Sequence, residues 1–306
     1  MGVNIAIMVE GQAGLTWPRW QALVRAVERL GFYGLYRSDH FTNAEPPDQE
    51  SLELWVSLTW LAANTTRIVF GPLVSPVSFR HPSMTARMAA AVDDLSGGRL
   101  QLGLGAGWQN REHDNFGFDL LPVPQRMQRY QEGLEVVTSL LRSDTPVTFT
   151  GQYFTLRDAI LLPRPRRAGG PPIVLGGKRG VLPLAVRYGS EWNVPFATPR
   201  EFRTLSGQLD RLLADQGREP GSVWRSVMTG LVFGRNDAEL AAKIDRGGRS
   251  LEELRRSGVI AGTASPVIEQ LGELAEAGVQ TVMLQWLDLD DLAGLEAFAV
   301  AVQPRV

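Results

Sequence analysis

SPVIEQLGELAEAGVQTVMLQW, residues 265–286, contains one complete helix–strand unit in its simplest form. Ser265 and Pro266 are typical of a helix start, and Gly278 is typical of a helix end. The run Val279–Trp286 is short and mostly apolar, which predicts a buried strand. Comparable units recur along almost the whole chain, so their number and order predict the fold.

Seven further short apolar runs predict strands, and segments with helical periodicity separate them. These runs are Val3–Val9, Gly34–Arg37, Arg67–Val74, Arg99–Leu104, Ile173–Leu175, Trp192–Val194 and Val227–Phe233. Between the first two, Thr16 can cap a helix that Gly31 ends. Eight strand–helix units predict an α/β protein, a single (β/α)₈ TIM barrel over residues 1–306. A doubly wound open sheet is the alternative that periodicity leaves open.

Two segments interrupt this alternation of predicted strands and helices. Between residues 146 and 167, two short β-type runs flank Gly151, which predicts an inserted β-hairpin. Residues 235–263 contain Gly247 and Gly248 among many charges, which indicates a lid loop or an ordinary surface loop.

Composition narrows the function classes. Lys and Arg number 31 and Asp and Glu number 33, so the chain lacks the basic surplus typical of nucleic-acid binding. The absence of cysteine excludes disulfides, thiolate metal sites and a cysteine nucleophile. No apolar run approaches the roughly 18 residues of a membrane span, and the amino terminus lacks a basic leader. We expect a cytoplasmic protein with a small-molecule substrate and with no nucleic-acid or membrane partner.

The chain has three histidines, His40, His81 and His113, and each follows a predicted strand. Parallel strands open at their carboxyl ends onto one face, where ligands bind, so we expect the three imidazoles at one pocket. Asp39-His40 is the sharpest motif, because a carboxylate beside an imidazole can fix its tautomer for acid–base catalysis. The alternative is structural: His40 caps the next helix and Asp39 binds backbone amides.

Three glycine-containing stretches follow predicted strands. Gly71–Pro76 holds two prolines and predicts a bulge that can press backbone against a flat ligand. Gly103–Trp108 fails the dinucleotide fingerprint at Trp108, yet its glycines allow close backbone approach, and Asn110 lies in the same loop. Gly176–Gly180 combines glycines with two cations before a helix, which favours an anion such as phosphate. Tight packing, or a solvated basic turn for Gly176–Gly180, is the alternative.

A metal-hydrolase site must also be weighed. The three histidines with Asp39 and Glu112 could in principle supply ligands. No closely spaced ligand pair is present to begin such a site, so the sequence predicts no bound metal.

These motifs, in this order, resemble the luciferase-like monooxygenase superfamily of flavin- and deazaflavin-dependent enzymes. The matching stretches are Ser38–Phe41, Thr66–Ile68 with Gly71, Ser75-Pro76, Arg80–Pro82, Leu95–Arg99, Gly103–Trp108, Arg111–His113, Gly151–Phe154, Gly176-Gly177 and Trp192-Asn193. The resemblance extends to about residue 196. Beyond it only the barrel pattern continues.

The resemblance implies a role for each matching residue. His40 is implied to be the proton donor or acceptor beside the reactive edge of the cofactor ring, with Asp39 next to it. The segment Leu73-Val74-Ser75, often holding a non-prolyl cis bond in the family, is implied to back the ring. The remaining implied cofactor contacts are Ser38, Gly105, Ala106, Gly107 and Asn110, with Gly176, Gly177 and Lys178 at its phosphate.

The chain is most similar to the branch that uses the deazaflavin coenzyme F420 for hydride transfer, with FMN-dependent monooxygenases as the alternative. Three positions depart from that branch. The loop after Gly177 is about two residues shorter than usual, Ser190 replaces a common acidic residue, and Trp108 stands where certain sugar-phosphate dehydrogenases carry a glutamate. The shortened loop keeps a third reading open, a non-catalytic cofactor-binding paralogue. Relatives often form homodimers, which is a possible assembly here.

Overall fold

In the computed structural model, which describes residues 2–306, parallel strands form a nearly closed barrel, and the predicted TIM-barrel fold is confirmed. The barrel strands are β1 (Asn4–Val9), β2 (Gly34–Arg37), β3 (Val69–Pro72), β5 (Leu102–Gly105), β8 (Ile173–Gly176), β9 (Glu191–Pro195), β10 (Trp224–Phe233) and β12 (Thr281–Gln285). Each contains or overlaps one of the eight apolar runs. The hydrogen-bonded order is β3-β2-β1-β12-β10-β9-β8-β5-β4, which excludes an open doubly wound sheet.

The barrel closes at a narrow seam between β3 and the segment leading into β5. A single parallel bridge joins Phe70 to Leu100 there. After β3 the chain bends and resumes as the two-residue strand β4 (Ser75–Pro76), which pairs with β5. The same strand therefore contributes to the barrel wall twice, once on each side of the bend.

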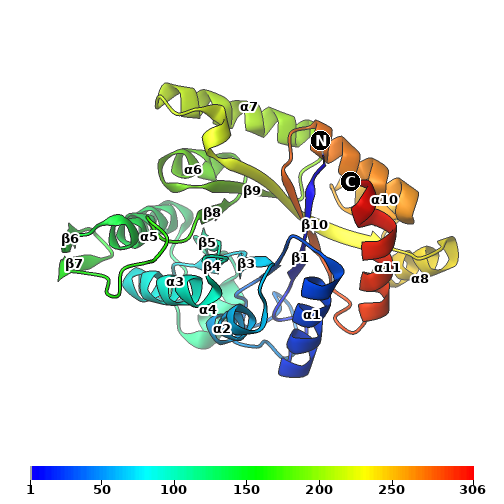
Figure 1. Cartoon of the computed structure of the whole chain (residues 1–306), viewed down its shortest axis with the longest axis horizontal. Coiled ribbons are helices and arrows are strands. Elements are labelled where there is room, and N and C mark those ends of the chain that lie inside the picture. The colour runs from blue at the N-terminus through cyan, green and yellow to red at the C-terminus, as the bar shows by residue number, and fades with distance from the viewer. Residues whose placement is uncertain (1) are drawn as a thin grey trace.

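Helices surround the strands (Figure 1). They are α1 (Trp17–Leu30), α2 (Leu54–Asn64), α3 (Pro82–Ser96), α4 (Asn110–Phe116), α5 (Val123–Arg142), α6 (Leu182–Tyr188), α7 (Pro199–Asp215), α8 (Asp237–Gly247), α9 (Leu251–Arg256), α10 (Ala264–Glu276) and α11 (Leu292–Val302). Gly31 ends α1 as predicted, in the left-handed conformation that ends many helices. Thr16 occupies the predicted position before α1, but its side chain makes no capping hydrogen bond. None of the helices among residues 2–306 combines the length and apolar character of a membrane span.

Two apolar layers hold the barrel together. The larger lies between the strands and the surrounding helices. A smaller cluster fills the barrel interior, with the buried side chains Ala6, Met8, Tyr36, Leu73, Val174 and Met283. Because the interior is packed, a ligand can enter only at an end of the strands.

The two segments outside the repeat are both ordered. Within residues 146–167, β6 (Val147–Thr150) and β7 (Thr155–Ala159) pair antiparallel. The expectation of a loop over residues 235–263 was wrong, because this segment holds α8, α9 and β11 (Ile260–Gly262), which pairs parallel with β10.

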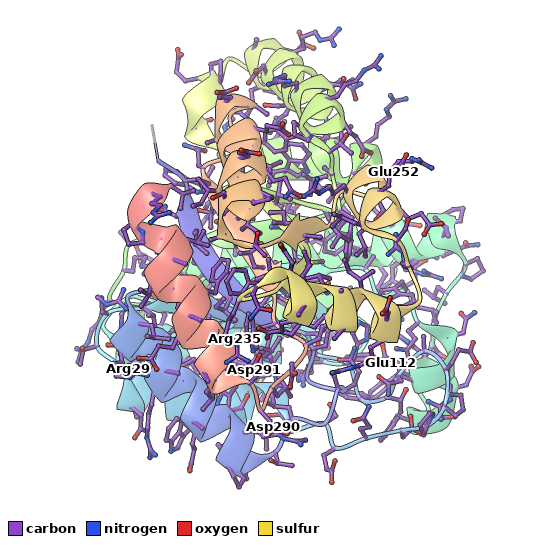
Figure 2. The ribbon with its side chains drawn as sticks, turned by 90° about the vertical axis from the view of Figure 1, so that its right-hand side faces the viewer. Arg29, Glu112, Arg235, Glu252, Asp290 and Asp291 are labelled. Atoms are coloured by element: carbon purple, nitrogen blue, oxygen red, sulfur yellow. The ribbon has the colours of Figure 1, made fainter. Side chains whose placement is uncertain are left out.

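Local polar contacts explain why residues 235–263 are helical. Asn236 caps α8 through its side chain, and Ser250 forms a capping box with Glu253 at α9. Lys243 of α8 forms ion pairs with Glu239 (3.0 Å) and with Asp291 (3.3 Å), which caps α11. Figure 2 shows α8 crossing the front of the molecule, with Asp291 near the start of α8. The segment is thus fastened to the final helix.

Candidate active site

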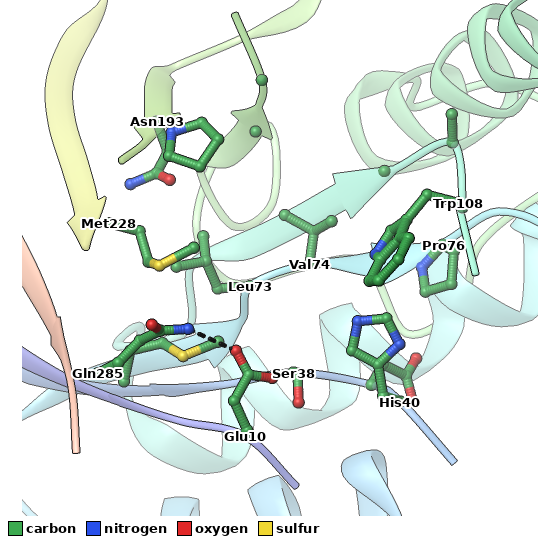
Figure 3. A pocket seen from close by; sticks show the side chains of 18 of the residues that line it. Glu10, Ser38, His40, Leu73, Val74, Pro76, Trp108, Asn193, Met228 and Gln285 are labelled. Atoms are coloured by element: carbon green, nitrogen blue, oxygen red, sulfur yellow. Dashed lines mark hydrogen bonds between the residues drawn. The ribbon is translucent and has the colours of Figure 1, made fainter. Parts of the chain in front are cut away.

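A cavity of about 460 Å³ opens at the carboxyl ends of the barrel strands, within the size range of small-molecule sites. Its lining residues are Met8, Glu10, Ser38, Asp39, His40, Leu73, Val74, Pro76, Gly105, Ala106, Gly107, Trp108, Glu112, Gly176, Gly177, Asn193, Pro195, Phe196, Met228 and Gln285. They come from strand ends all around the barrel. Figure 3 shows His40 and Trp108 at one end of the cavity, with Gln285 and Asn193 toward the other.

Most of the residues implied by the resemblance line this cavity, and three do not. Ser75 is buried behind the wall, where its hydroxyl donates to Asp39 over 2.7 Å. Asn110 is exposed at the first turn of α4. Lys178 is also exposed, and its ammonium is ion-paired with Glu201 over 2.8 Å. Its assignment to a phosphate is therefore the weakest of those predictions.

His40 is held by a carboxylate that lies 72 residues farther along the chain. Its Nδ1 lies 2.9 Å and 3.1 Å from the two carboxylate oxygens of Glu112. One of these oxygens also accepts the backbone N–H of Phe41 over 3.0 Å. Because a carboxylate only accepts hydrogen bonds, Nδ1 carries the proton and Nε2 is the nitrogen left for a ligand.

Glu112 also sets the charge of His40. Burial by itself lowers the pKa of the imidazole, but the hydrogen bond and the negative charge of Glu112 outweigh burial and raise that pKa above its ordinary value. The charges of Glu10 and Asp39 act in the same direction. The indole of Trp108 packs edge-on against the imidazole, with ring centroids 5.4 Å apart. The arrangement suits a group that exchanges a proton near neutral pH.

Asp39 does not serve as the carboxylate partner of His40, which corrects the pairing expected from their adjacency. Both residues follow the end of β2, and their side chains bind different partners. The Asp39 carboxylate accepts hydrogen bonds from Ser75 and from both terminal nitrogens of Arg80. Burial raises the pKa of Asp39, although Arg80 and Ser75 oppose that effect. Arg80 also pairs with Glu53 over 2.9 Å, so Asp39 belongs to an ion-pair network beneath the cavity wall.

The expectation that all three histidines meet at one pocket was also wrong. His81 caps α3 by accepting the backbone N–H of Ser83, the role weighed as the structural alternative for His40. His113 is fully buried, with hydrogen bonds to Gln109 (2.7 Å) and Ser78 (2.8 Å). Burial lowers the pKa of His113, which keeps this ring neutral.

The bend after β3 forms one wall of the cavity. A cis peptide bond joins Leu73 to Val74, a non-prolyl bond of the kind that the resemblance implied. The glycine of β5 that faces this wall has no room for a side chain, because a Cβ on Gly105 would lie 2.4 Å from Val74. A Cβ on Gly103 would similarly lie 2.0 Å from the Pro72 carbonyl oxygen. These glycines therefore serve strand packing, and Gly105 also lines the cavity.

Several polar lining residues were given no role from the sequence. Glu10 accepts hydrogen bonds from Gln285 (2.7 Å) and Gln12 (3.1 Å). Asn193 donates to Ser226 in the barrel interior over 2.8 Å. Glu10 and Gln285 lie at the carboxyl ends of β1 and β12, and that position is a signal that could have identified them. Asn193 lies in the middle of β9, so that signal does not apply to it.

The described residues 2–306 contain no group of three His, Asp or Glu side chains arranged as metal ligands. The metal-hydrolase alternative thus has no candidate ligand set in this part of the chain.

Comparison with known proteins agrees with this architecture. A model of the luciferase-like monooxygenase family matches residues 3–252. A 4-hydroxyprotoasukamycin monooxygenase of Streptomyces nodosus subsp. asukaensis is 34% identical over 62% of this chain and 48% of its own length. An F420-dependent hydroxymycolic acid dehydrogenase of Mycobacterium tuberculosis is 31% identical over 73% of this chain and 61% of its own. The chain thus spans less than two thirds of either relative.

Solved structures show the same fold. The coenzyme F420-dependent tetrahydromethanopterin reductase from Methanopyrus kandleri has a TM-score of 0.81 at 20% identity, over 99% of both chains. EDTA monooxygenase from Chelativorans sp. BNC1 has a TM-score of 0.83 at 18% identity, over 99% of this chain and 93% of its own. At such identities the likeness extends to the fold alone.

Proposed function

Because the chain belongs to the luciferase-like monooxygenase family, we propose that it is an oxidoreductase that uses coenzyme F420 for hydride transfer to or from a small organic molecule. The observation that carries the proposal is His40, an imidazole at the cavity wall whose Nδ1 is held by buried Glu112. Two relatives named as F420-dependent dehydrogenases, 29% and 31% identical, support the choice of coenzyme.

The cavity fits a planar ring. One wall is the apolar segment Leu73-Val74, with Pro76 beside it. Because Gly105 has no side chain, β5 packs directly against that wall. Polar side chains lie opposite this wall, where Figure 3 shows Gln285, Glu10, Ser38 and His40 in sequence across the cavity. Such an arrangement supports one face of a ring and leaves the opposite side to polar groups. The residues that would hold it are Ser38, Leu73, Val74, Gly105, Ala106, Gly107, Gly176 and Gly177.

When bound, a deazaflavin supplies a two-electron hydride transfer. The protein supplies the proton chemistry. Nε2 of His40 takes the proton that a hydroxyl or amino group of the substrate loses when it is oxidised, and returns a proton in the reverse direction. Glu112 keeps Nδ1 protonated and stabilises the imidazolium formed in between. Trp108 covers the imidazole and limits the access of water.

An FMN-dependent monooxygenase is the second candidate, because the 34%-identical relative is named as a monooxygenase. Both candidates use the same cavity and the same imidazole. They differ in the coenzyme bound and in whether oxygen is consumed.

The test begins with binding of F420 and of FMN to the purified protein, followed by turnover with each reduced coenzyme. Replacement His40→Gln is expected to lower the rate by about a hundredfold to ten-thousandfold, the usual contribution of a general acid–base group. His81→Gln, at the exposed start of α3, is the matched control and is expected to keep wild-type turnover.

F420 turnover without oxygen uptake supports the first candidate, and FMN-dependent oxygen uptake supports the second. Failure to bind either coenzyme at micromolar concentration refutes both, and tight binding without turnover over a broad substrate panel points to a non-catalytic paralogue.

A further inference from the structure

A carboxyl group is buried inside the barrel, below the cavity. Glu191 begins β9, and its side chain is only 4% exposed. Among residues 2–306, no lysine, arginine or histidine nitrogen lies within ion-pair distance of it. A buried carboxylate without a cation is costly, so its remaining contacts deserve a physical explanation.

A chain of hydrogen bonds links Glu191 to the cavity. The hydroxyl of Ser226 donates to Glu191 Oε1 over 2.5 Å. Ser226 Oγ in turn accepts a hydrogen bond from Nδ2 of Asn193 over 2.8 Å. Asn193 lines the cavity, although it is only 2% exposed to solvent (Figure 3). The three side chains thus connect the barrel interior directly to the ligand site.

The direction of this chain fixes what Asn193 offers to a ligand. An ionised carboxylate only accepts, so Ser226 must donate to Glu191 and must accept from Asn193. Nδ2 of Asn193 is thereby committed to the interior, where it also lies 3.5 Å from Sδ of Met283. The carbonyl oxygen Oδ1 is the atom left for the cavity.

The groups that face Glu191 do not compete for its proton. Tyr33 and Tyr36 are titratable side chains that feel the charge of Glu191, and burial, followed by that charge, raises both tyrosine pKa values. Val174 of β8 and Trp224 of β10 pair with Glu191 in register, and Ser226 of β10 reaches it through its hydroxyl. Burial raises the pKa of Glu191 to about 7, partly offset by the hydrogen bond from Ser226.

We propose that Glu191 is a positioning residue that, through Ser226, holds Asn193 with its carbonyl oxygen toward the cavity, where it accepts the N–H of an amide or imide in the bound ligand. Protonation of Glu191 reverses the direction of these hydrogen bonds. The carboxylic acid then donates to Ser226, and Ser226 donates to Oδ1 of Asn193. The amide then turns its Nδ2 toward the cavity. The inference rests on the proposed function only for its probes, F420 and FMN, whose rings carry such an N–H group.

The binding experiment measures coenzyme affinity by fluorescence between about pH 6 and about pH 8. Because His40 also titrates, the measurement uses the His40→Asn background. There, affinity is expected to fall about tenfold at the lower pH, the cost of one lost buried hydrogen bond. Adding Glu191→Gln, or Ser226→Ala, is expected to abolish this pH dependence. An unchanged slope in both double variants overturns the proposal, and so does a flat profile in His40→Asn alone.

A second measurement needs no coenzyme and keeps the inference separate from the proposed function. The side-chain amide resonances of Asn193, observed by NMR in an otherwise wild-type protein, are expected to shift with a midpoint near pH 7. Glu191→Gln is expected to remove that transition without unfolding the barrel, which its thermal unfolding curve checks. If Asn193 resonances are insensitive to pH, the relay is wrong even when coenzyme binds. If neither coenzyme binds but the transition is present, only the proposed function fails.

Discussion

Replacing Glu191 by glutamine is expected to change the pH dependence of folding stability by an amount that the structure specifies. The pKa of Glu191 is raised from 4.5 to about 7 in the folded protein. The folded state therefore holds a proton that the unfolded chain has released between these two values. The stability that Glu191 contributes is fully present at a pH below the pKa that this residue has in the unfolded chain. It is lost as the pH rises through about 7, the pKa in the folded protein.

The magnitude follows from the size of that shift. A difference of about 2.5 pKa units corresponds to about 3 kcal/mol at 1.36 kcal/mol per unit. Most of it, about 2.5 kcal/mol, falls between about pH 5 and about pH 8. Glutamine cannot titrate, so the Glu191→Gln variant escapes this loss. Relative to wild type, the variant should gain about 2.5 kcal/mol of unfolding free energy over that interval.

Urea denaturation of both proteins at a series of pH values measures this gain. Subtracting the two curves cancels the titration of groups that the two proteins share. Glu276→Gln removes an exposed glutamate from α10 and controls for the loss of one negative charge. A difference curve for Glu191→Gln that stays level from about pH 5 to about pH 8 refutes the reasoning, because Glu191 then does not titrate in that range.

Three further changes test the candidate site. Glu112→Gln is expected to lower the pKa of His40, since it removes the hydrogen bond and the charge that raise it, and NMR titration of the imidazole measures this. Arg80→Met is expected to cost about 3–5 kcal/mol in urea denaturation, because it leaves buried Asp39 without its cation. Gly105→Ala is expected to cost about 1–3 kcal/mol and to weaken coenzyme binding, because the new methyl group overlaps the cavity wall.

Two of these changes have a control within the same chain. The double variant Arg80→Met with Asp39→Asn is expected to recover part of the lost stability, since the uncompensated charge is gone. Gly180→Ala adds the same methyl group where no atom lies within 4 Å, and its stability should match that of wild type to within about 0.5 kcal/mol. An equal loss for Gly180→Ala and Gly105→Ala contradicts the overlap argument. For Glu112→Gln, an unmoved titration of His40 contradicts the assigned contact.

Local patterns predicted the barrel because most of its strands, such as β1, β2, β5 and β12, are short and almost fully buried. Val279–Trp286 contains all of β12, and four of the five residues of that strand are buried. The segment 235–263 was predicted as a loop because Gly247 and Gly248 and its many charges were given more weight than the apolar residues of α8, Leu240 and Ile244. Its caps were visible in the sequence, at Asn236 and Ser250, but a cap alone does not predict a helix.

The candidate site, like the fold, was only partly predictable from the sequence. The strand-end position of His40 was enough to place it at the cavity. Its carboxylate partner could not be chosen from the sequence, because Asp39 is adjacent whereas Glu112 reaches it only through the fold. The acceptor direction of Asn193 depends on a three-residue relay across two strands, which no spacing along the chain encodes.

The bend at Leu73-Val74 is part of a barrel strand, whereas residues 235–263 belong to the crossover between β10 and α10. Crossover connections tolerate insertion and replacement far better than strands do. We therefore expect substitutions within residues 235–263, none of which lines the cavity, to be better tolerated than substitutions at the Leu73-Val74 bend.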